Sequence, residues 1–302
     1  MYPNNREELR NKYLDIRSQL ADNADSLIGL ERFMAYTVTK ILRDNYNQIE
    51  HDYNSSSELY PYWQTYPPQE RGRQPIGDQY PWIEVGEHAV GTWLAMNLSR
   101  YFEVDNLTLP SGPDQRFVVT HPEIAKATND ITDSAWLMID IKSAGPRDDA
   151  HNSVMSHNQL SGSGKWPSVV EGVMNDALMA TGKRRSHEFL PTLPPIVIDT
   201  YERVLPVVTM ALKPIYKMES NIPVSEGWRG QPLSRLDLAT IPNGLLLCVN
   251  PNYIREHPGL LFPGKDDKSV ALLKRRARVN FTILETIGAW RHKIINNKNT
   301  KI

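Results

Sequence analysis

The sequence predicts an α/β fold with a mixed central β-sheet flanked by helices. The N-terminal part repeats apolar residues at helical spacing, and the middle of the chain holds apolar, β-branched runs of strand length. The helical segments are 5–22 and 25–44, and the strand-like segments are 134–143, 196–201 and 206–218. Helices followed by strands mixed with further helices are typical of this class. With 302 residues, 40% of them hydrophobic, the chain is long enough for one large domain or two small ones, and we expect a single domain over residues 1–302.

Residues 1–50 are expected to contribute two packing helices. Residues 5–22 carry apolar side chains near helical spacing, and Asp25-Ser26 is a candidate cap for the helix that runs to residue 44. Residues 53–82 are rich in Pro and Tyr. Because proline lacks the backbone N–H that a helix uses, this stretch predicts an ordered loop or arm.

The next helix is predicted over residues 82–99. Its apolar stripe is expected to comprise Val85, Ala89, Trp93 and Met96. Glu84 and Glu87 lie near its start, where the positive end of the helix dipole favours acidic side chains. The sequence alone does not rank one of these glutamates above the other.

The strand at 134–143 ends with two charged residues in an otherwise apolar run. Side chains alternate faces along a strand. One face carries Trp136, Met138, Asp140 and Lys142, and the other, expected to point into a core, carries Leu137, Ile139 and Ile141. Because burying an unpaired charge is costly, a carboxylate beside an ammonium at this position indicates a functional site.

A second carboxylate, Asp114, lies 26 residues before Asp140, after the turn-forming Ser-Gly-Pro. The chain between them is long enough for a strand at 117–120 and a hairpin-like return that brings the two carboxylates together within segment 111–149. Two carboxylates and a lysine suit Mg²⁺ and phosphodiester cleavage. We expect Asp114, Asp140 and Lys142 to be catalytic. The two carboxylates would be metal ligands with the Ile141 carbonyl, and Lys142 would act on the attacking water and the phosphate.

The second half of the chain is predicted to mix strands, loops and one helix. Residues 143–166 are predicted to form a long polar loop, and loops of this length usually have a functional role. A helix is predicted over 167–186, followed by strands over 196–201, 206–218, 245–250 and 274–281. In the last strand Arg276, Arg278 and Asn280 share one face, and Ala277, Val279 and Phe281 point inward.

Charge is distributed unevenly along the chain. The net charge is −1, but residues 265–302 hold ten Lys and Arg against three Asp and Glu, a net +7. A local basic segment of this kind is either a solvated tail or the footprint of a nucleic acid. The single cysteine, Cys248, excludes an intramolecular disulfide, and no apolar run approaches the length of a membrane span. We therefore expect a cytoplasmic protein without a membrane partner.

The motif Pro113-Asp114 followed by Asp140-Ile141-Lys142 resembles the PD-(D/E)xK signature of type II restriction endonucleases. Further blocks in the same order extend the resemblance across most of the chain, to the BglI family of these enzymes. The blocks are 82–91, 111–116, 132–149, 242–251 and 263–281. The resemblance implies a restriction-endonuclease-like fold and a Mg²⁺-dependent homodimer. Such a dimer would cut double-stranded DNA at an interrupted palindrome and leave a 3′ overhang.

The resemblance also implies which residues contact bases. Asp148, Lys265, Asp267, Arg276 and Arg278 match the family's base-contacting positions. Similar enzymes often place a helix glutamate near the metal site, and Glu87 is the candidate for that position, with Glu84 as the alternative. Arginine reads guanine and aspartate accepts from cytosine, so we expect G·C-rich half-sites such as GCC/GGC. The remaining basic residues are expected to contact phosphates, namely Lys274, Arg275, Arg291 and Lys293.

Three alternatives stay open at the level of sequence. A repair or recombination nuclease reading DNA structure would use the same chemistry, and a non-catalytic sequence-specific DNA-binding protein would have no use for Asp114, Asp140 and Lys142. A phosphate-processing enzyme acting on small molecules has little support, because the chain holds neither a P-loop nor a G-x-G-x-x-G motif.

Overall fold

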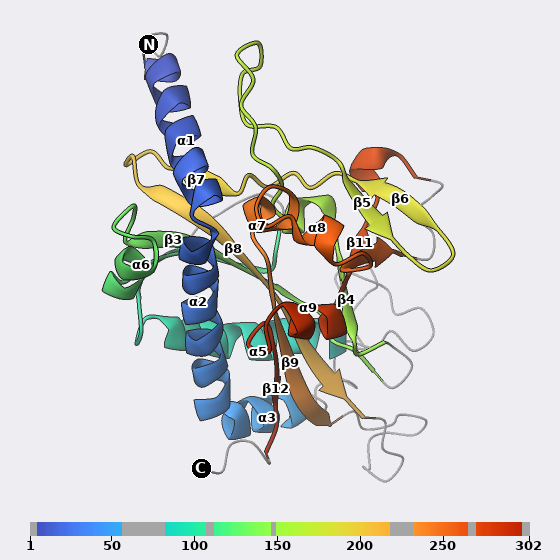
Figure 1. Ribbon diagram of the computed structural model, residues 1–302. Helices are drawn as coiled ribbons and strands as arrows, with labels where there is room; N and C mark the ends of the chain where they lie inside the picture. The colour runs from blue at the N-terminus through green and yellow to red at the C-terminus, as the bar shows by residue number, and fades with distance from the viewer. Residues whose placement is uncertain are drawn as a thin grey trace, which may run out of the picture.

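The computed structural model describes residues 5–55, 82–106, 112–145, 149–217, 232–264 and 270–297. Within these ranges the central element is a seven-stranded sheet (Figure 1). Its strands are β1 (Glu103–Asn106), β2 (Gln115–Thr120), β3 (Ser134–Ile141), β7 (Ile196–Ile198), β8 (Val204–Tyr216), β9 (Leu233–Ile241) and β12 (His292–Ile295). The order is β1-β2-β3-β8-β9-β12, with β7 paired to β8. Only β3 and β8 are parallel among these pairs, so the predicted mixed sheet is confirmed.

Helices cover one face of this sheet. They are α2 (Ala24–Asp44), α3 (Tyr46–Ser55) and α5 (Trp82–Leu98), and α1 (Asn5–Asp22) precedes them. Leu137, Ile139 and Ile141 of β3 pack into the core that these helices form, as predicted. The helices predicted over 5–22, 25–44 and 82–99 are thus present, and residues 53–55, predicted as the start of a loop, belong instead to α3. Residues 56–81 lie outside the described ranges.

Two details of the predicted helices are wrong. The N-cap of α2 is Asn23 rather than Asp25-Ser26, and no side chain caps it. In α5 the fully buried apolar residues are Val90, Leu94 and Leu98. Of the predicted stripe, Ala89 and Trp93 are half-buried, Met96 is 63% exposed, and the Val85 side chain lies outside the described residues. The helix contacts the sheet along glycines at 86 and 91, and an apolar pattern that skips glycine misplaces the buried face.

The other face of the sheet carries a smaller β-layer, which holds β4 (Asn152–Met155), β10 (Leu261–Pro263), β11 (Ala277–Asn280) and the hairpin of β5 (Leu178–Thr181) and β6 (Ser186–Phe189). Figure 1 shows these strands grouped with the short helices α7 (Gly244–Cys248), α8 (Tyr253–Glu256) and α9 (Phe281–Ile287). Ala211 and Ala239 of the central sheet pack against Val279 and Phe281 of this layer. Small residues on the sheet allow that close approach.

The helix predicted over 167–186 is wrong, since this segment contains β5 and the start of β6. Buried residues recur at every second position in the hairpin, with Leu178 and Ala180 buried and Met179 exposed between them. Period two is the strand period, and Pro167 and Gly172 disfavour a helix through this stretch. The predicted loop 143–166 likewise contains β4 and the 3₁₀ turn η2 (His157–Gln159).

The strand predicted over 245–250 is also wrong. Residues Gly244–Cys248 form α7, whose first turn is capped by the Asn243 side chain accepting from the Leu245 N–H at 2.9 Å. A short, fully buried apolar run has the same hydrophobic pattern in a helix and in a strand, so periodicity does not separate them. The strand predicted over 274–281 is shorter in the structure, where β11 covers Ala277–Asn280, Lys274 ends a 3₁₀ turn and Phe281 begins α9.

A buried ion pair joins α2 to the approach of β12. Arg291 Nη2 lies 2.7 Å from Glu31 Oε2, and both side chains are at most 1% exposed. Burial raises the pKa of Glu31, and the charge of Arg291 opposes that rise. The expectation that Arg291 contacts DNA phosphates is therefore wrong, because its guanidinium lies inside the protein.

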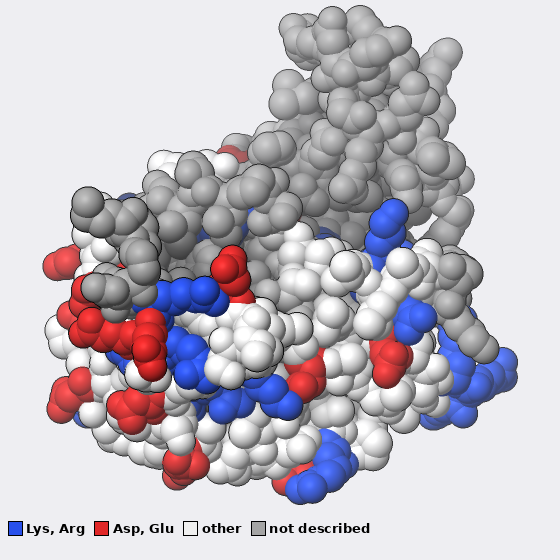
Figure 2. Space-filling model, turned by 90° about the horizontal axis from the view of Figure 1, so that it is seen from above, with Lys and Arg blue, Asp and Glu red and all other residues white. Residues whose placement is uncertain are grey.

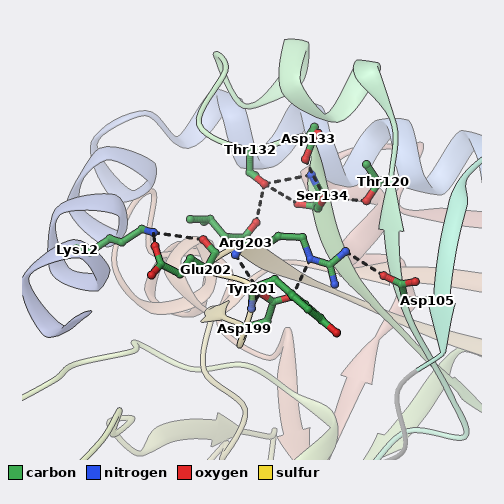
Figure 3. A network of polar contacts seen from close by, with 11 residues as sticks. Lys12, Asp105, Thr120, Thr132, Asp133, Ser134, Asp199, Tyr201, Glu202 and Arg203 are labelled. Carbon is green, nitrogen blue, oxygen red and sulfur yellow. Dashed lines mark hydrogen bonds and ion pairs between the residues drawn. The ribbon is translucent and has the colours of Figure 1, made fainter. Parts of the chain in front are cut away.

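Polar contacts fix the start of β3, at the opposite end of the strand from Asp140 (Figure 3). The Thr132 hydroxyl donates to the Val204 carbonyl at 2.6 Å and accepts from the Ser134 N–H at 3.1 Å. The Arg203 guanidinium binds Asp199 and Asp105 at 2.8 and 2.9 Å. These contacts hold the parallel pair of β3 and β8 in register, and that register sets Ala211 of β8 beside Asp140.

Candidate active site

The antiparallel pair of β2 and β3 brings Asp114 to Asp140. The last paired residues are Gln115 and Ile139, so one further step in the same register sets Asp114 opposite Asp140. Directly opposed residues on antiparallel strands share a face. The Asp114 carboxylate accepts a hydrogen bond from the Ile141 backbone N–H, and the two atoms are 2.6 Å apart. The hairpin-like return predicted from the sequence is confirmed, with the short helix α6 (Pro122–Ala127) inside it.

Asp140 is fully buried, and each of its carboxylate oxygens faces a different partner. Oδ2 lies 2.6 Å from the Lys142 ammonium, whose side chain is 34% exposed. Oδ1 accepts a hydrogen bond from the Gln159 amide. Apart from the ion pair with Lys142, Oδ2 has no hydrogen-bond donor in the described part of the chain.

Burial raises the pKa of Asp140 to about 6, from 3.8. Lys142 and the Gln159 amide lower it, whereas the charge of Asp114 adds to the rise. The site therefore holds a carboxylate that is costly to keep ionised and whose Oδ2 contacts only the Lys142 ammonium among the described residues. A cation would relieve both conditions.

The donor set suits a hard divalent cation. Asp114 and Asp140 offer oxygen ligands, and Mg²⁺ binds through one or two carboxylates while its other positions go to water and substrate phosphate. Within the described ranges no cluster of three or more His, Cys, Asp or Glu that could hold a metal ion is present.

Helix α5 lies directly against the end of the active-site strand. A Cβ added at Gly86 would overlap the Ser143 hydroxyl and lie 3.3 Å from the Ser143 Cβ. A side chain at position 86 would therefore require the hydroxyl of Ser143, the neighbour of Lys142, to move. Glu87 follows Gly86 in α5, and its side chain lies outside the described part of the structure.

The expected base-contacting residues are only partly described. Arg278 lies in β11, half-buried, opposite Val154 of β4, and Arg276 lies just before β11 and is exposed. Ala277 and Val279 are buried as predicted. Asp148, Lys265 and Asp267 lie outside the described residues. The structure therefore brings the candidate catalytic residues Asp114, Asp140 and Lys142 together. Of the expected base-contacting residues, it places only Arg276 and Arg278.

Sequence reasoning missed two residues near this site, Gln159 and Lys213. Lys213 of β8 is 5% exposed and lies on the same sheet face as Asp140, two residues beyond the Asp140 partner Ala211. Its ammonium donates to the carbonyls of Asp149 and Asn152 at 2.8 and 2.6 Å. A lysine inside an apolar strand is the signal that identified Lys142, and it was equally present at 213.

Charge on the surface is mixed. Figure 2 shows that, on the described part of the face viewed there, Lys and Arg side chains are interspersed with Asp and Glu. None of the described helices is long and apolar enough to cross a membrane.

Comparison with known proteins gives consistent matches over nearly the whole chain. A family model described as restriction endonuclease BglI matches residues 8–295. The type II restriction enzyme BglI of Bacillus subtilis is 40% identical over 292 residues, which cover 95% of this chain and 97% of that protein.

Two solved structures resemble the fold. The crystal structure of BglI bound to its DNA recognition sequence superposes with a TM-score of 0.87, covering 98% of this chain and 99% of that one at 40% identity. The crystal structure of tetrameric SfiI bound to cognate DNA has a TM-score of 0.56 at 15% identity, covering 90% and 85%. The second similarity concerns the fold alone.

Proposed function

Because this chain belongs to the BglI family of type II restriction endonucleases, which cut DNA, we propose that it hydrolyses both strands of an interrupted, G·C-rich palindrome with the help of Mg²⁺. Family membership favours a site-specific deoxyribonuclease over the non-catalytic regulator and the structure-reading repair nuclease. The observation that carries the proposed mechanism is the grouping of Asp114, Asp140 and Lys142 at the ends of paired strands.

The catalytic roles follow from the contacts of each residue. Asp114 and Asp140, with the Ile141 carbonyl, would hold Mg²⁺. When bound there, the cation would neutralise charge on the scissile phosphate and lower the pKa of the attacking water. The Lys142 ammonium lies against the Asp140 carboxylate. Because the Lys142 side chain is partly exposed, it can also reach the scissile phosphate. Water oxygen would attack phosphorus and the bond from phosphorus to the 3′ oxygen would break, leaving a 5′-phosphate and a 3′-hydroxyl.

Recognition would come from the basic segment beside the site. Arg276 and Arg278 are the candidate readers of guanine, together with Asp148, Lys265 and Asp267, and Glu87 would support the metal site from α5. We expect half-sites of the GCC/GGC type and a cut that leaves a 3′ overhang. A two-fold homodimer would read both half-sites, because a symmetric protein matches a symmetric sequence. The enzyme would act in the cytoplasm as one domain over residues 1–302.

The direct test is to incubate the purified protein with a plasmid of known sequence and Mg²⁺, and then to sequence the fragment ends. Discrete fragments that share flanking bases are expected, and they define both the site and the cut position. Random ends, or cutting confined to branched DNA, would contradict the proposal. The Asp140→Ala variant serves as the matched control, since it should bind the same site without cutting.

A further inference from the structure

Gln159 lies at the junction between the β-layer and the active site. It belongs to η2, the single turn that follows β4, and its side chain is 7% exposed. Its Nε2 donates to Asp140 Oδ1, and its Oε1 accepts from the Ser156 N–H at 2.7 Å. Both ends of the amide are therefore used, one by the backbone of its own turn and the other by a candidate metal ligand.

This pairing fixes the orientation of the amide. The Ser156 backbone group is a donor and requires the amide oxygen, so the NH₂ group must point to Asp140. The capping box is completed by the Ser156 side chain, which accepts from the backbone N–H of residue 159. Gln159 is held rigidly, and it holds Oδ1 of Asp140 while Oδ2 faces Lys142.

The segment that leads into η2 also contacts β11, the strand that carries the candidate base-reading Arg278. β4 pairs antiparallel with β11, with Val154 opposite Arg278, and Arg278 Nη1 donates to Asn152 Oδ1 at 3.2 Å. The Asn152 carbonyl in turn accepts from Lys213 of the central sheet. Four residues after β4 ends at Met155, the chain reaches Asp140 through Gln159. One continuous run of eight residues, 152–159, thus touches both a candidate base-reading arginine and the catalytic carboxylate.

We propose that Gln159 is a positioning residue that couples DNA recognition at β11 to the catalytic geometry of Asp140. A shift of β4 as Arg278 engages a base moves the Ser156 turn, and the Gln159 amide transmits that shift to Oδ1. Correct recognition orients Oδ2 for the cation, and incorrect recognition leaves it misaligned. The inference rests on the proposed roles of Asp140 and Arg278 and adds a connection between them.

The test compares two substitutions at position 159. Gln159→Glu keeps the shape and the oxygen that accepts from Ser156, but replaces the amide donor with an oxygen that faces Asp140. Gln159→Met keeps the side-chain length and removes both side-chain hydrogen bonds, to Asp140 and to the Ser156 N–H. Ser156→Ala is the matched control, because it alters the same turn without removing a contact to Asp140. Thermal melting of each variant reports whether the fold is retained.

The measurement is the single-turnover cleavage rate on a cognate duplex with enzyme in excess, over a series of Mg²⁺ concentrations, with duplex affinity measured in Ca²⁺. Both Gln159 variants should cleave about 10- to 100-fold more slowly, the range typical for residues that orient a metal ligand. They should require more Mg²⁺ for half-maximal rate, with cognate affinity within about threefold of the parent protein. A simple loss of fold would lower affinity as well and would not shift the Mg²⁺ dependence.

A second measurement tests the coupling between base recognition and cleavage. The ratio of cleavage rates between the cognate duplex and one with a single changed base pair should fall in Gln159→Glu more than the corresponding ratio of affinities. Parental rates and ratios in both Gln159 variants, alongside an inactive Asp140→Ala, would overturn the inference and leave the proposed function intact. Cleavage by Asp140→Ala would instead overturn the proposed mechanism itself.

Discussion

The Asp114 carboxylate accepts a hydrogen bond from the backbone N–H of Ile141, with Asp114 Oδ2 2.6 Å from Ile141 N. The exposed Asp114 side chain, which immediately precedes β2, is thereby hydrogen-bonded to the strand β3 that leads into Lys142 and carries Asp140. The same residue 141 offers its carbonyl as a candidate metal ligand. The geometry of the site is therefore set by the backbone of the β2–β3 pair.

Asp114→Asn should abolish cleavage while leaving the fold and site-specific binding intact. Asparagine keeps a carbonyl oxygen for the Ile141 N–H but removes the charge that a divalent cation requires. Single-turnover cleavage and gel-shift titration in Ca²⁺ measure the two effects. Asp133→Asn is the matched control, since Asp133 is an exposed carboxylate at the other end of β3. Equal cleavage by the Asp114 and Asp133 variants would remove Asp114 from the catalytic set.

Asp140→Asn should make the protein more stable at pH 8 in the presence of EDTA. The folded pKa of Asp140 is raised to about 6, so stability from this group is full below about pH 3.8 and is lost as pH rises through 6. At pH 8 the ionised carboxylate is destabilising, and the neutral amide relieves that cost by about 1–3 kcal/mol. Thermal melting across pH measures the difference, which should shrink toward pH 4.

Mg²⁺ supplies the control for that prediction. Because a ligand that binds only the folded state stabilises it, Mg²⁺ should raise the melting temperature of the parent protein at pH 8 and leave Asp140→Asn unchanged. The effect on the parent should weaken as the pH falls below about 6, where Asp140 takes up a proton. A variant that melts below the parent at pH 8 in EDTA would contradict the account of Asp140 burial.

Glu31→Ala should destabilise the fold by about 3–5 kcal/mol, because it leaves the buried Arg291 guanidinium without its partner. Urea unfolding measures the loss. Replacing both residues, as in Glu31→Leu with Arg291→Met, should cost less than Glu31→Ala alone. Lys293→Ala is the control, since it removes a nearby, partly exposed charge. If Arg291→Ala instead left stability unchanged and reduced the salt dependence of DNA binding, Arg291 would be a phosphate contact after all.

The sequence predicted the centre of the site better than its surroundings. Asp140 and Lys142 stand out because two charges interrupt an apolar strand, and the turn before Asp114 permits a return to the same place. Gln159 has no such signal. Its contact with Asp140 depends on η2, which follows β4, and β4 is held by pairing with β11, more than a hundred residues later. Likewise, only the packed structure separates Arg291, buried against Glu31, from the exposed basic residues around it.

Arg278→Ala should weaken binding to the cognate site by about 1–3 kcal/mol, roughly 5- to 150-fold, and affect random DNA far less. The Arg278 side chain is already oriented by its hydrogen bond to Asn152, and an arginine held in this way can read guanine bidentately. Fluorescence anisotropy on cognate and random duplexes in Ca²⁺ gives both affinities. Lys274→Ala is the control, because an exposed lysine that contacts phosphate should weaken both duplexes alike and lower the salt slope by about one. An equal loss on both duplexes from Arg278→Ala would make Arg278 a phosphate contact, and it would also leave the proposed coupling through Gln159 without a recognition signal to transmit.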